Sequence, residues 1–477
     1  MKKKTYLFYD IETTGLNKCF DQILQFAAIR TDASLNKLEQ HEIRIRLNLD
    51  IIPSPTAIIT NRISVNKMLS GKPEIEAIQE IHQLMNNPGT ISVGYNTLGF
   101  DDEFLRFSFY RNLLPPYTHQ FNNQCGRLDL FPITILYYLY KSDILNWPTP
   151  LNMKLENLSK MNKLAHGQAH DAMVDVNACI SLAKKFMAHK KMWQYVIGYF
   201  DKKIDTHRLI QLPIAIKSAF SHHPAGLLIQ GNFGSTLAYQ APVIGLGPHK
   251  HYKNQYIWLR LDCEELSNTT KKTIPETTYS IRKIAGVQPI VLPAFKRYLH
   301  HLSPKRFQLA NENKQWLIAH PDIFQSICDY YQNFIYPNVP NLDSDAALYA
   351  IGFSTPYEEF LFKRFHLLSV VEEKEKIAFE FPNPIRREQA LRLIGRNYFN
   401  LLSKKNQQNF FEYLKDIYDC EKNLSFDYQG KSRFTRNDAL KEIAFLRKEK
   451  ILDAEQSILL DDLSNYLLNK LFKYQFN

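Results

Sequence analysis

Two carboxylates stand two residues apart near the start of the chain, in the stretch FYDIETTGL (8–16). Side chains at positions i and i+2 of a β-strand point to the same face, so Asp10 and Glu12 are expected to project side by side. Like charges at that distance raise each other's pKa unless a cation lies between them, and Mg²⁺ prefers carboxylate oxygens. The motif predicts a divalent-cation site, although a lone pair of acids at a strand end more often faces water.

Further candidate residues lie in two distant stretches. In GYNTLGFDDEFLR (94–106), a strand is expected to lead into a helix whose first turn holds Asp101 and Asp102, and a capping role competes for either acid. In AHDAMVDV (169–176), His170 and Asp175 are five residues apart, which is about 140° around one helix. They converge only if His170 lies on the loop before the helix. A lone histidine there could also make an ordinary polar contact.

The secondary structure that would position these residues follows from the hydrophobic pattern. The predicted strands of the first part are 5–12, 23–31, 42–49 and 90–95. The predicted helices are 74–87, 100–114, 127–141, 155–163 and 171–187. This order is typical of an α/β domain with a mixed sheet, ending near residue 190.

The pattern of predicted secondary structure changes after residue 190. Between about 200 and 300, short β-like runs broken by Gly and Pro predict a small barrel. From about residue 304 helical patterns dominate, and they continue after the loop 336–346 to the end of the chain. We therefore expect three domains, which are residues 1–190, 191–345 and 346–477.

The net charge of the chain indicates the kind of partner that it binds. The 477 residues include 59 basic and 48 acidic side chains, a net charge of +11, and residues 200–300 alone hold 13 basic and 6 acidic residues. This excess favours nucleic acid first and a membrane surface second, although a solvated basic surface without a partner also fits. Six scattered cysteines without a C-x-x-C pair fit a reducing cytoplasm. The sequence predicts no secretory signal and no membrane span.

Several motifs together resemble a known family. D-x-E, N-x-x-x-F-D and H-x-x-x-x-D occur in the order typical of DEDD exonucleases with a catalytic histidine, at Asp10, Glu12, Asp101, His170 and Asp175. QFAAIRTD (25–32), FYRN (109–112), DAALYAIGF (345–353) and GRNYF (395–399) resemble segments of the bacterial exonuclease I family. The resemblance implies an α/β, ribonuclease-H-like exonuclease domain with a mixed sheet, an SH3-like β-barrel domain and an α-helical C-terminal domain.

The resemblance also implies a function. It implies a 3′→5′ exodeoxyribonuclease that degrades single-stranded DNA processively to 5′-mononucleotides by two-metal-ion hydrolysis, in DNA repair and recombination. His170 would be the general base, and Asp102 and Asp171 would be extra acids beside the motif positions. A monomer is expected, without membrane association, that binds the acidic tail of single-stranded DNA-binding protein. Two Mg²⁺ ions, or Mn²⁺, would be bound by Asp10, Glu12, Asp101 and Asp175.

Substrate contacts are implied by the same resemblance. Gly15 would let the backbone approach the terminal nucleotide, Arg106 and Lys154 would meet phosphates, and Tyr117 would stack on a base. Each could equally be an ordinary turn or surface residue. Lys154 stands where the family has Arg, so the single charge of an ammonium group would replace the forked contact of a guanidinium group. The linker before Lys154 is also shorter than is usual in the family. The full set of implied contacts is Glu12, Thr13, Gly15, Leu16, Arg106, Tyr117, Phe121 and Lys154.

Two other interpretations stay open. The same chemistry could act on RNA ends or in polymerase proofreading, and the basic barrel and helical tail argue against proofreading. A non-enzymatic DNA-binding relative would be favoured by the loss of a motif acid or the histidine. None of these residues is lost.

Overall fold

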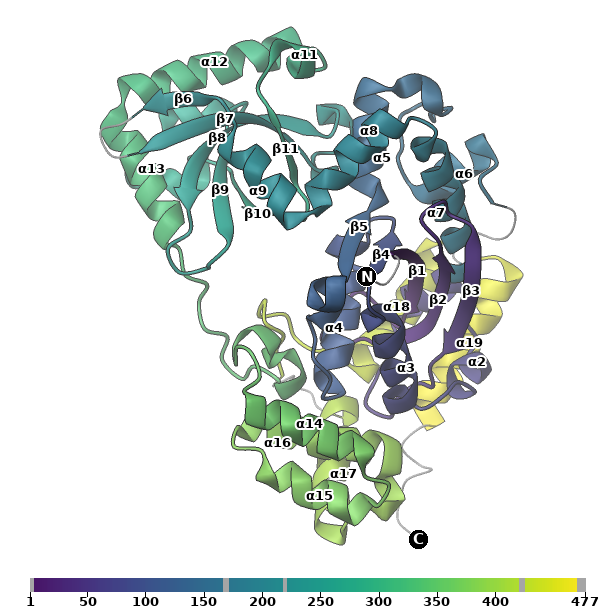
Figure 1. Ribbon diagram of the computed structural model, residues 1–477. Coiled ribbons are helices and arrows are strands. Elements are labelled where there is room, and N and C mark those ends of the chain that lie inside the picture. Colours follow the sequence, from purple (N-terminus) through teal and green to yellow (C-terminus); the bar gives the residue numbers. More distant parts are fainter. Residues whose placement is uncertain (1–3, 166–170, 218–220, 420–424, 470–477) are drawn as a thin grey trace. The chain divides into compact units, whose positions relative to one another are not determined.

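The structure is a computed structural model that describes residues 4–165, 171–217, 221–419 and 425–469 (Figure 1). By its internal contacts the chain divides into two compact units. Unit 1 comprises residues 1–126, 166–177 and 338–477, and unit 2 comprises residues 127–165 and 178–337. Unit 1 therefore joins the N-terminal part of the chain to its C-terminal part.

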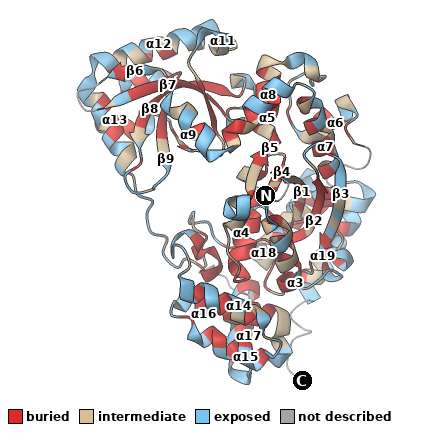
Figure 2. Cartoon of the chain, in the orientation of Figure 1, coloured by how far each residue is buried: buried red, intermediate tan, exposed pale blue. Residues whose placement is uncertain are grey.

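The sheet of unit 1 is built around β1 (Thr5–Thr13). β1 pairs antiparallel with β2 (Ile23–Thr31) and parallel with β4 (Thr90–Gly94), and β2 pairs antiparallel with β3 (Lys37–Arg44). The strand order is β3-β2-β1-β4, so the sheet is mixed, as predicted. Figure 2 shows β1 and β2 largely buried, whereas exposed residues lie along β3.

Alternation along β1 gives the strand two distinct faces. Leu7, Tyr9 and Ile11 are buried in a core with residues of α3 (Glu74–Asn86) and α4 (Asp101–Arg111). The intervening positions include Asp10 and Glu12, which therefore point to the face opposite that core. The apolar half of the strand thus anchors the two acids.

Two predicted elements are wrong in their bounds. β3 covers residues 37–44 rather than 42–49, because an edge strand pairs through its backbone and needs few apolar side chains, so KLEQHEIR carries no apolar alternation. Residues 126–129 form a strand, β5, rather than the start of a helix. α5 (Leu130–Tyr140) begins only where Asp129 accepts a hydrogen bond from the Phe131 N–H at 2.9 Å and caps it.

Unit 2 contains an antiparallel sheet. Its order is β10-β9-β8-β7-β11, and β6 pairs with β7. α12 (Pro304–Ala319) and α13 (Pro321–Asn333) pack their apolar residues against β8 and β9. The strands are β6 (Ile214–Lys217), β7 (His222–Ile229), β8 (Gln240–Pro248), β9 (Gln255–Arg260), β10 (Ser280–Ile284) and β11 (Ile290–Pro293). The helices before them are α5, α6 (Leu155–Asn162), α8 (Lys190–Ile197) and α9 (Lys202–Ile210).

The C-terminal part of unit 1 is helical, as predicted. α18 and α19 share a core with α1 (Pro55–Asn61) and α2 (Val65–Leu69), so the end of the described chain packs on N-terminal residues. Within the described ranges, no helix combines the length and the apolar character that crossing a bilayer requires. The helices are α14 (Pro356–Leu367), α15 (Val371–Glu380), α16 (Pro384–Tyr398), α17 (Lys404–Asp419), α18 (Arg436–Glu449) and α19 (Ala454–Asn469).

Candidate active site

The two acids of β1 lie just beyond its parallel pairing. The pairing with β4 runs from Thr5 opposite Thr90 to Phe8 opposite Val93. Asp10 and Glu12 follow it, paired with Ala27 and Gln25 of β2. Because β1 and β4 part at their carboxyl ends, side chains from the turn after β4 can face the acids of β1.

That turn places Asp101. β4 ends at Gly94, where an added Cβ would overlap the Thr97 side chain, and Asn96 turns the chain with φ of 63°. A short 3₁₀ turn (Thr97–Gly99) follows, and Asp101 is then the first residue of α4. Asp101 therefore lies in a helical first turn, at the carboxyl end of the strand next to β1.

Asp175 is presented by the first turn of α7 (Ala172–Met187), which begins in unit 1. The Asp171 carboxylate accepts hydrogen bonds from the backbone N–H groups of Met173 at 2.9 Å and Val174 at 3.4 Å. Asp171 therefore caps the helix, one turn before Asp175. His170, the predicted general base, lies outside the described residues.

The pKa values show that the motif acids are electrostatic neighbours. Burial raises the pKa of Asp10 well above its ordinary value, and the charges of Asp101, Asp175, Glu12 and Asp171 raise it further. Burial, followed by the charges of Asp175, Asp101 and Asp171, raises the pKa of Glu12 to about 8. The structure thus brings the four motif acids, Asp10, Glu12, Asp101 and Asp175, together with Asp171, into one neighbourhood of mutual repulsion.

The donor set fits a hard divalent cation in its chemistry. No three Asp, Glu, His or Cys side chains within residues 4–165, 171–217, 221–419 and 425–469 form a ready-made group that could hold a metal ion. Carboxylate oxygens are nevertheless the ligands that Mg²⁺ prefers. A cation among them would also relieve the repulsion that raises the pKa of Asp10 and Glu12.

Asp102 has a different environment from Asp101. Its side chain is fully buried and accepts hydrogen bonds from Arg106 Nη2 at 2.9 Å and from His119 Nε2 at 2.9 Å. These two contacts, like the capping bonds of Asp171, occupy the extra acids in local structure. His119 carries no signal in the sequence, because a lone histidine in PYTHQ has no spacing that indicates a role.

The turn after β1 is tightly bonded. Thr13 Oγ1 donates to the Gly15 carbonyl at 2.7 Å, and Thr14 Oγ1 donates to Asp21 Oδ1 at 2.8 Å. A Cβ on Gly15 would lie 2.6 Å from Asp21 Oδ1, so the packing of Asp21 already requires glycine there. Leu16 is 80% exposed at the tip of this turn. The exposed Leu16 side chain therefore projects from a turn that hydrogen bonds hold in place.

The other predicted DNA contacts differ in their surroundings. Arg106 donates to the Tyr349 hydroxyl at 2.8 Å as well as to Asp102, and its guanidinium lies over the Tyr117 ring at 5.3 Å. A phosphate would have to compete with these partners. Phe121 is 69% exposed. Lys154 is exposed in unit 2, and its backbone N–H donates to Asn152 Oδ1 at 2.9 Å.

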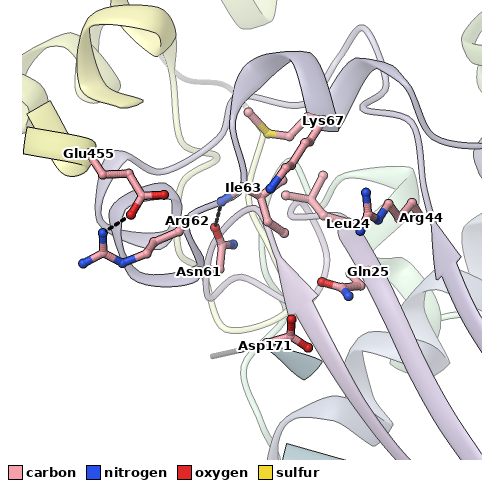
Figure 3. Close-up of a pocket in the computed structure, with 10 residues that line it drawn as sticks. Leu24, Gln25, Arg44, Asn61, Arg62, Ile63, Lys67, Asp171 and Glu455 are labelled. Carbon is pink, nitrogen blue, oxygen red and sulfur yellow. Dashed lines mark hydrogen bonds and ion pairs between the residues drawn. The ribbon is translucent and has the colours of Figure 1, made fainter. Parts of the chain in front are cut away.

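A pocket in unit 1 is lined by acidic, amide and basic side chains (Figure 3). Its lining includes Asp171 and Gln25, the residue that pairs with Glu12 across β1 and β2. Lys67 and Arg44 also line it, and Figure 3 shows both side chains around the same hollow. The pocket therefore brings two cationic side chains to the same hollow as Asp171.

The comparisons with known proteins define the class first. Residues 7–183 match the family model described as exonuclease (RNase_T), a stretch that contains every motif acid. Exodeoxyribonuclease I of Buchnera aphidicola subsp. Schizaphis graminum is 27% identical over 98% of this chain and 95% of its own length. Exodeoxyribonuclease I of Escherichia coli is 30% identical over 60% of each chain. The chain therefore carries an exonuclease domain and, as the motifs predicted, is similar over almost its whole length to exodeoxyribonuclease I.

Solved structures confirm the fold. E. coli exonuclease I in complex with a dA16 oligonucleotide aligns with a TM-score of 0.83 at 24% identity, covering 98% of this chain and 100% of that one. The zinc-bound form of an E. coli exonuclease I complex with single-stranded DNA aligns with a TM-score of 0.81 at 24% identity and the same coverage. The expected fold class, with its ribonuclease-H-like exonuclease domain, is therefore confirmed.

Proposed function

We propose that this protein is a 3′→5′ exonuclease that removes 5′-mononucleotides from single-stranded DNA. The observation that carries the proposal is the group of four carboxylates at the end of β1, where the pKa of Asp10 and that of Glu12 are raised by burial and by neighbouring acids. Such a group is unfavourable by itself and suits divalent cations with a phosphodiester. The names of the relatives and the DNA-bound neighbours agree with this substrate class.

The proposed metal ligands are the four motif acids, with two Mg²⁺ ions, or Mn²⁺, as the cofactor. When bound, such ions neutralise phosphate charge, activate a water molecule and stabilise the leaving oxygen. Asp10 and Glu12 project from a strand whose other face is anchored in the core, so they form the fixed side of the site. Asp101 and Asp175 approach from the first turns of two helices.

His170 is the proposed general base. An imidazole with an ordinary pKa of about 6.5 can accept a proton from the attacking water near neutral pH. Attack at the last phosphodiester from the 3′ end would release one 5′-mononucleotide at each step. Removing the His170 imidazole should strongly lower the rate of mononucleotide release. DNA binding measured in chelator should stay nearly unchanged.

Substrate binding is proposed to combine apolar and basic contacts. Leu16 and Phe121 are exposed apolar side chains suited to bases near the 3′ end, and Tyr117 offers a ring. Arg106 and Lys154 would meet phosphates, together with Thr13 and Gly15 of the turn. The basic excess of residues 200–300 should make affinity fall steeply with salt. A flat salt titration would count against this contribution.

The remaining proposals concern the context of the activity. We propose processive digestion in repair and recombination, a cytoplasmic monomer, and binding of the acidic tail of single-stranded DNA-binding protein. The division into domains 1–190, 191–345 and 346–477 also remains a proposal. Its first boundary differs from the contact-based units, which place residues 127–165 in unit 2.

The testing experiment uses one single-stranded DNA oligomer labelled at either end, and an RNA oligomer of the same sequence. With Mg²⁺, the 3′-labelled DNA should release labelled mononucleotide at once, whereas the 5′-labelled DNA should shorten stepwise. Chelator should stop both reactions, and RNA should be cut more slowly. Internal cleavage or metal-independent cleavage would contradict the proposal. Faster cleavage of RNA would favour the interpretation of an enzyme for RNA ends.

A further inference from the structure

The first turn of α4 is held by side chains other than a cap, among them Glu103, which pairs with Lys18. It carries Asp101, and its N-cap position is occupied by Phe100, whose side chain has no atom that can accept a hydrogen bond. The acids Asp101, Asp102 and Glu103 suit the helix dipole, but a dipole does not fix the orientation of a turn. A helix end without a side-chain cap is prone to fraying.

Asp102 is the buried anchor of this turn. Its buried carboxylate accepts hydrogen bonds from Arg106 and from His119, each at 2.9 Å. Arg106 is one turn further along the same helix, so this bond moves with α4. His119 belongs to a separate 3₁₀ turn (Thr118–Gln120), and its bond therefore ties the start of α4 to another segment.

His119 is itself held in place. It is 1% exposed, and its ring packs edge-on against Phe109 with 5.5 Å between centroids. Phe109 is fully buried in the core that α3 and α4 share with the sheet. The imidazole is thus a fixed point for Asp102, supported by the same core that anchors β1.

Asp101 and Asp102 are consecutive on the helix, so their side chains project about 100° apart. One direction leads to His119, and the other leads to Asp10 and Glu12, whose pKa values Asp101 raises. We propose that His119 is a positioning residue for Asp101: by holding Asp102, it fixes the first turn of α4 so that the Asp101 carboxylate meets the divalent cation. This inference rests on the proposed function.

The test compares four variants of the full-length chain. His119→Asn shortens the side chain so that it no longer reaches Asp102, and His119→Leu keeps the packing on Phe109 without the hydrogen bond. His119→Gln places an amide N–H near the position of Nε2 and should restore the bond. The matched control is His82→Asn, because His82 packs on the same Phe109 ring at 4.8 Å but bonds the Pro115 carbonyl at 3.0 Å and Thr118 Oγ1 at 3.4 Å instead of Asp102.

The main readout is Mn²⁺ binding to the protein without DNA, measured by titration calorimetry. His119→Asn and His119→Leu should weaken binding about 10–100-fold, the usual effect of losing a residue that orients a metal ligand. His119→Gln and His82→Asn should bind Mn²⁺ as the wild type does. The Mg²⁺ concentration for half-maximal rate should rise in parallel, and DNA affinity in chelator should stay unchanged.

Wild-type Mn²⁺ affinity in either folded bond-breaking variant would overturn the inference, as would an equal loss in His82→Asn. If neither of those variants folds, Asp102→Asn decides instead, because it keeps the shape of the side chain and should weaken Mn²⁺ binding. Asp101→Asn distinguishes failure of the proposed ligand set from failure of the positioning role. If Asp101→Asn binds Mn²⁺ as the wild type does, the proposed ligand set is wrong. If Asp101→Asn weakens Mn²⁺ binding but the His119 variants do not, only the positioning role is wrong.

Discussion

Two groups of carboxylates in unit 1 have opposite electrostatic surroundings. At the end of β1, burial and neighbouring acids raise the pKa of Asp10 and Glu12. Asp50 is also fully buried, and burial acts to raise its pKa, but the charges of Arg396 and Arg433 bring that pKa far below its ordinary value. Arg396 Nη2 donates to Asp50 Oδ2 at 2.7 Å, and the Tyr413 hydroxyl donates to the same oxygen at 2.8 Å.

The second group extends across the C-terminal helices. Arg392 and Arg433 outweigh the effect of burial and lower the pKa of Asp343 to about 2. Arg392 donates to Asp343 at 2.6 Å, and Arg396 also pairs with Asp345. The comparison teaches that this chain neutralises acids with arginine where they support the fold. At the end of β1 the acids repel one another, which suits a cation supplied from solution.

The largest expected effect comes from breaking the neutralised group. Asp50→Asn removes the carboxylate that Arg396 and Arg433 share, so the free energy of unfolding should fall by about 3–5 kcal/mol. Chemical denaturation measures this change. The matched control is Asp453→Asn, which breaks a surface pair with Arg62 and should change the free energy of unfolding far less. Equal losses in both variants would show that burial of the Asp50 group contributes nothing.

Removing a charge from the other group should have the opposite effect on stability. Asp10→Asn relieves repulsion, so in chelator the free energy of unfolding should stay equal or rise. The rate of mononucleotide release should fall at least about a hundredfold, because losing a proposed ligand must cost as much as losing a residue that orients one. Denaturation in chelator and kcat on single-stranded DNA give the two values. If Asp10→Asn were less stable than the wild type and kept its kcat, Asp10 would support the fold and would not be a metal ligand.

A third acid lies between the two extremes. Burial raises the pKa of Asp21 to about 6, while hydrogen bonds from Asn17 and Thr14 and the charge of Arg111 lower it. Gly15→Ala would place a Cβ 2.6 Å from Asp21 Oδ1 and disturb those bonds, at a cost of about 1–3 kcal/mol in unfolding free energy. Gly126→Ala is the control, because its Cβ would meet only the flexible end of Ile91 at 3.0 Å. Similar losses in the two variants would refute the tight fit at Gly15.

The smallest expected effect is the pH dependence of stability, whose sign should differ between the groups. Folding raises the pKa of Glu12 from 4.5 to about 8, so the folded chain binds the extra proton, and this contribution in chelator should decline as the pH rises between those values. Folding lowers the pKa of Asp343 from 3.8 to about 2, so its contribution is present above 3.8 and is lost toward pH 2. Melting temperatures between pH 5 and 9, for wild type and Glu12→Gln, test the first sign. An unchanged slope in Glu12→Gln would contradict it.

Local patterns made much of the N-terminal fold predictable. The strands 5–12 and 23–31 and the helix 74–87 combine apolar periodicity with adequate length, and the structure has them within one residue. β3 could not be found in this way, since its polar sequence gains its conformation from pairing with β2. β5 was hidden in the apolar run of α5, where Asp129 is the signal that marks the change.

Each motif acid carries a local signal in the sequence, such as a strand end or a helical first turn, and the structure places Asp10, Glu12, Asp101 and Asp175 in those contexts. Residues that act through distant partners carry no such signal. The Asp50–Arg396 pair joins positions 346 residues apart, and His119 reaches Asp102 through a loop without a motif. Arg106 shows the same limit, because its bond to Tyr349 links positions 243 residues apart. Pairs of residues so far apart in the sequence can be recognised only from the three-dimensional structure.

The most direct test of the central claim is a calorimetric titration of the DNA-free protein with Mg²⁺ near pH 7, in buffers of different ionisation enthalpy. The acids at the end of β1 should bind Mg²⁺ saturably and release protons as they do so, because the pKa of Glu12 is about 8 before binding. Asp10→Asn should weaken this binding at least about a hundredfold. Absence of saturable binding, or binding that is unchanged in Asp10→Asn and releases no proton, would contradict the claim.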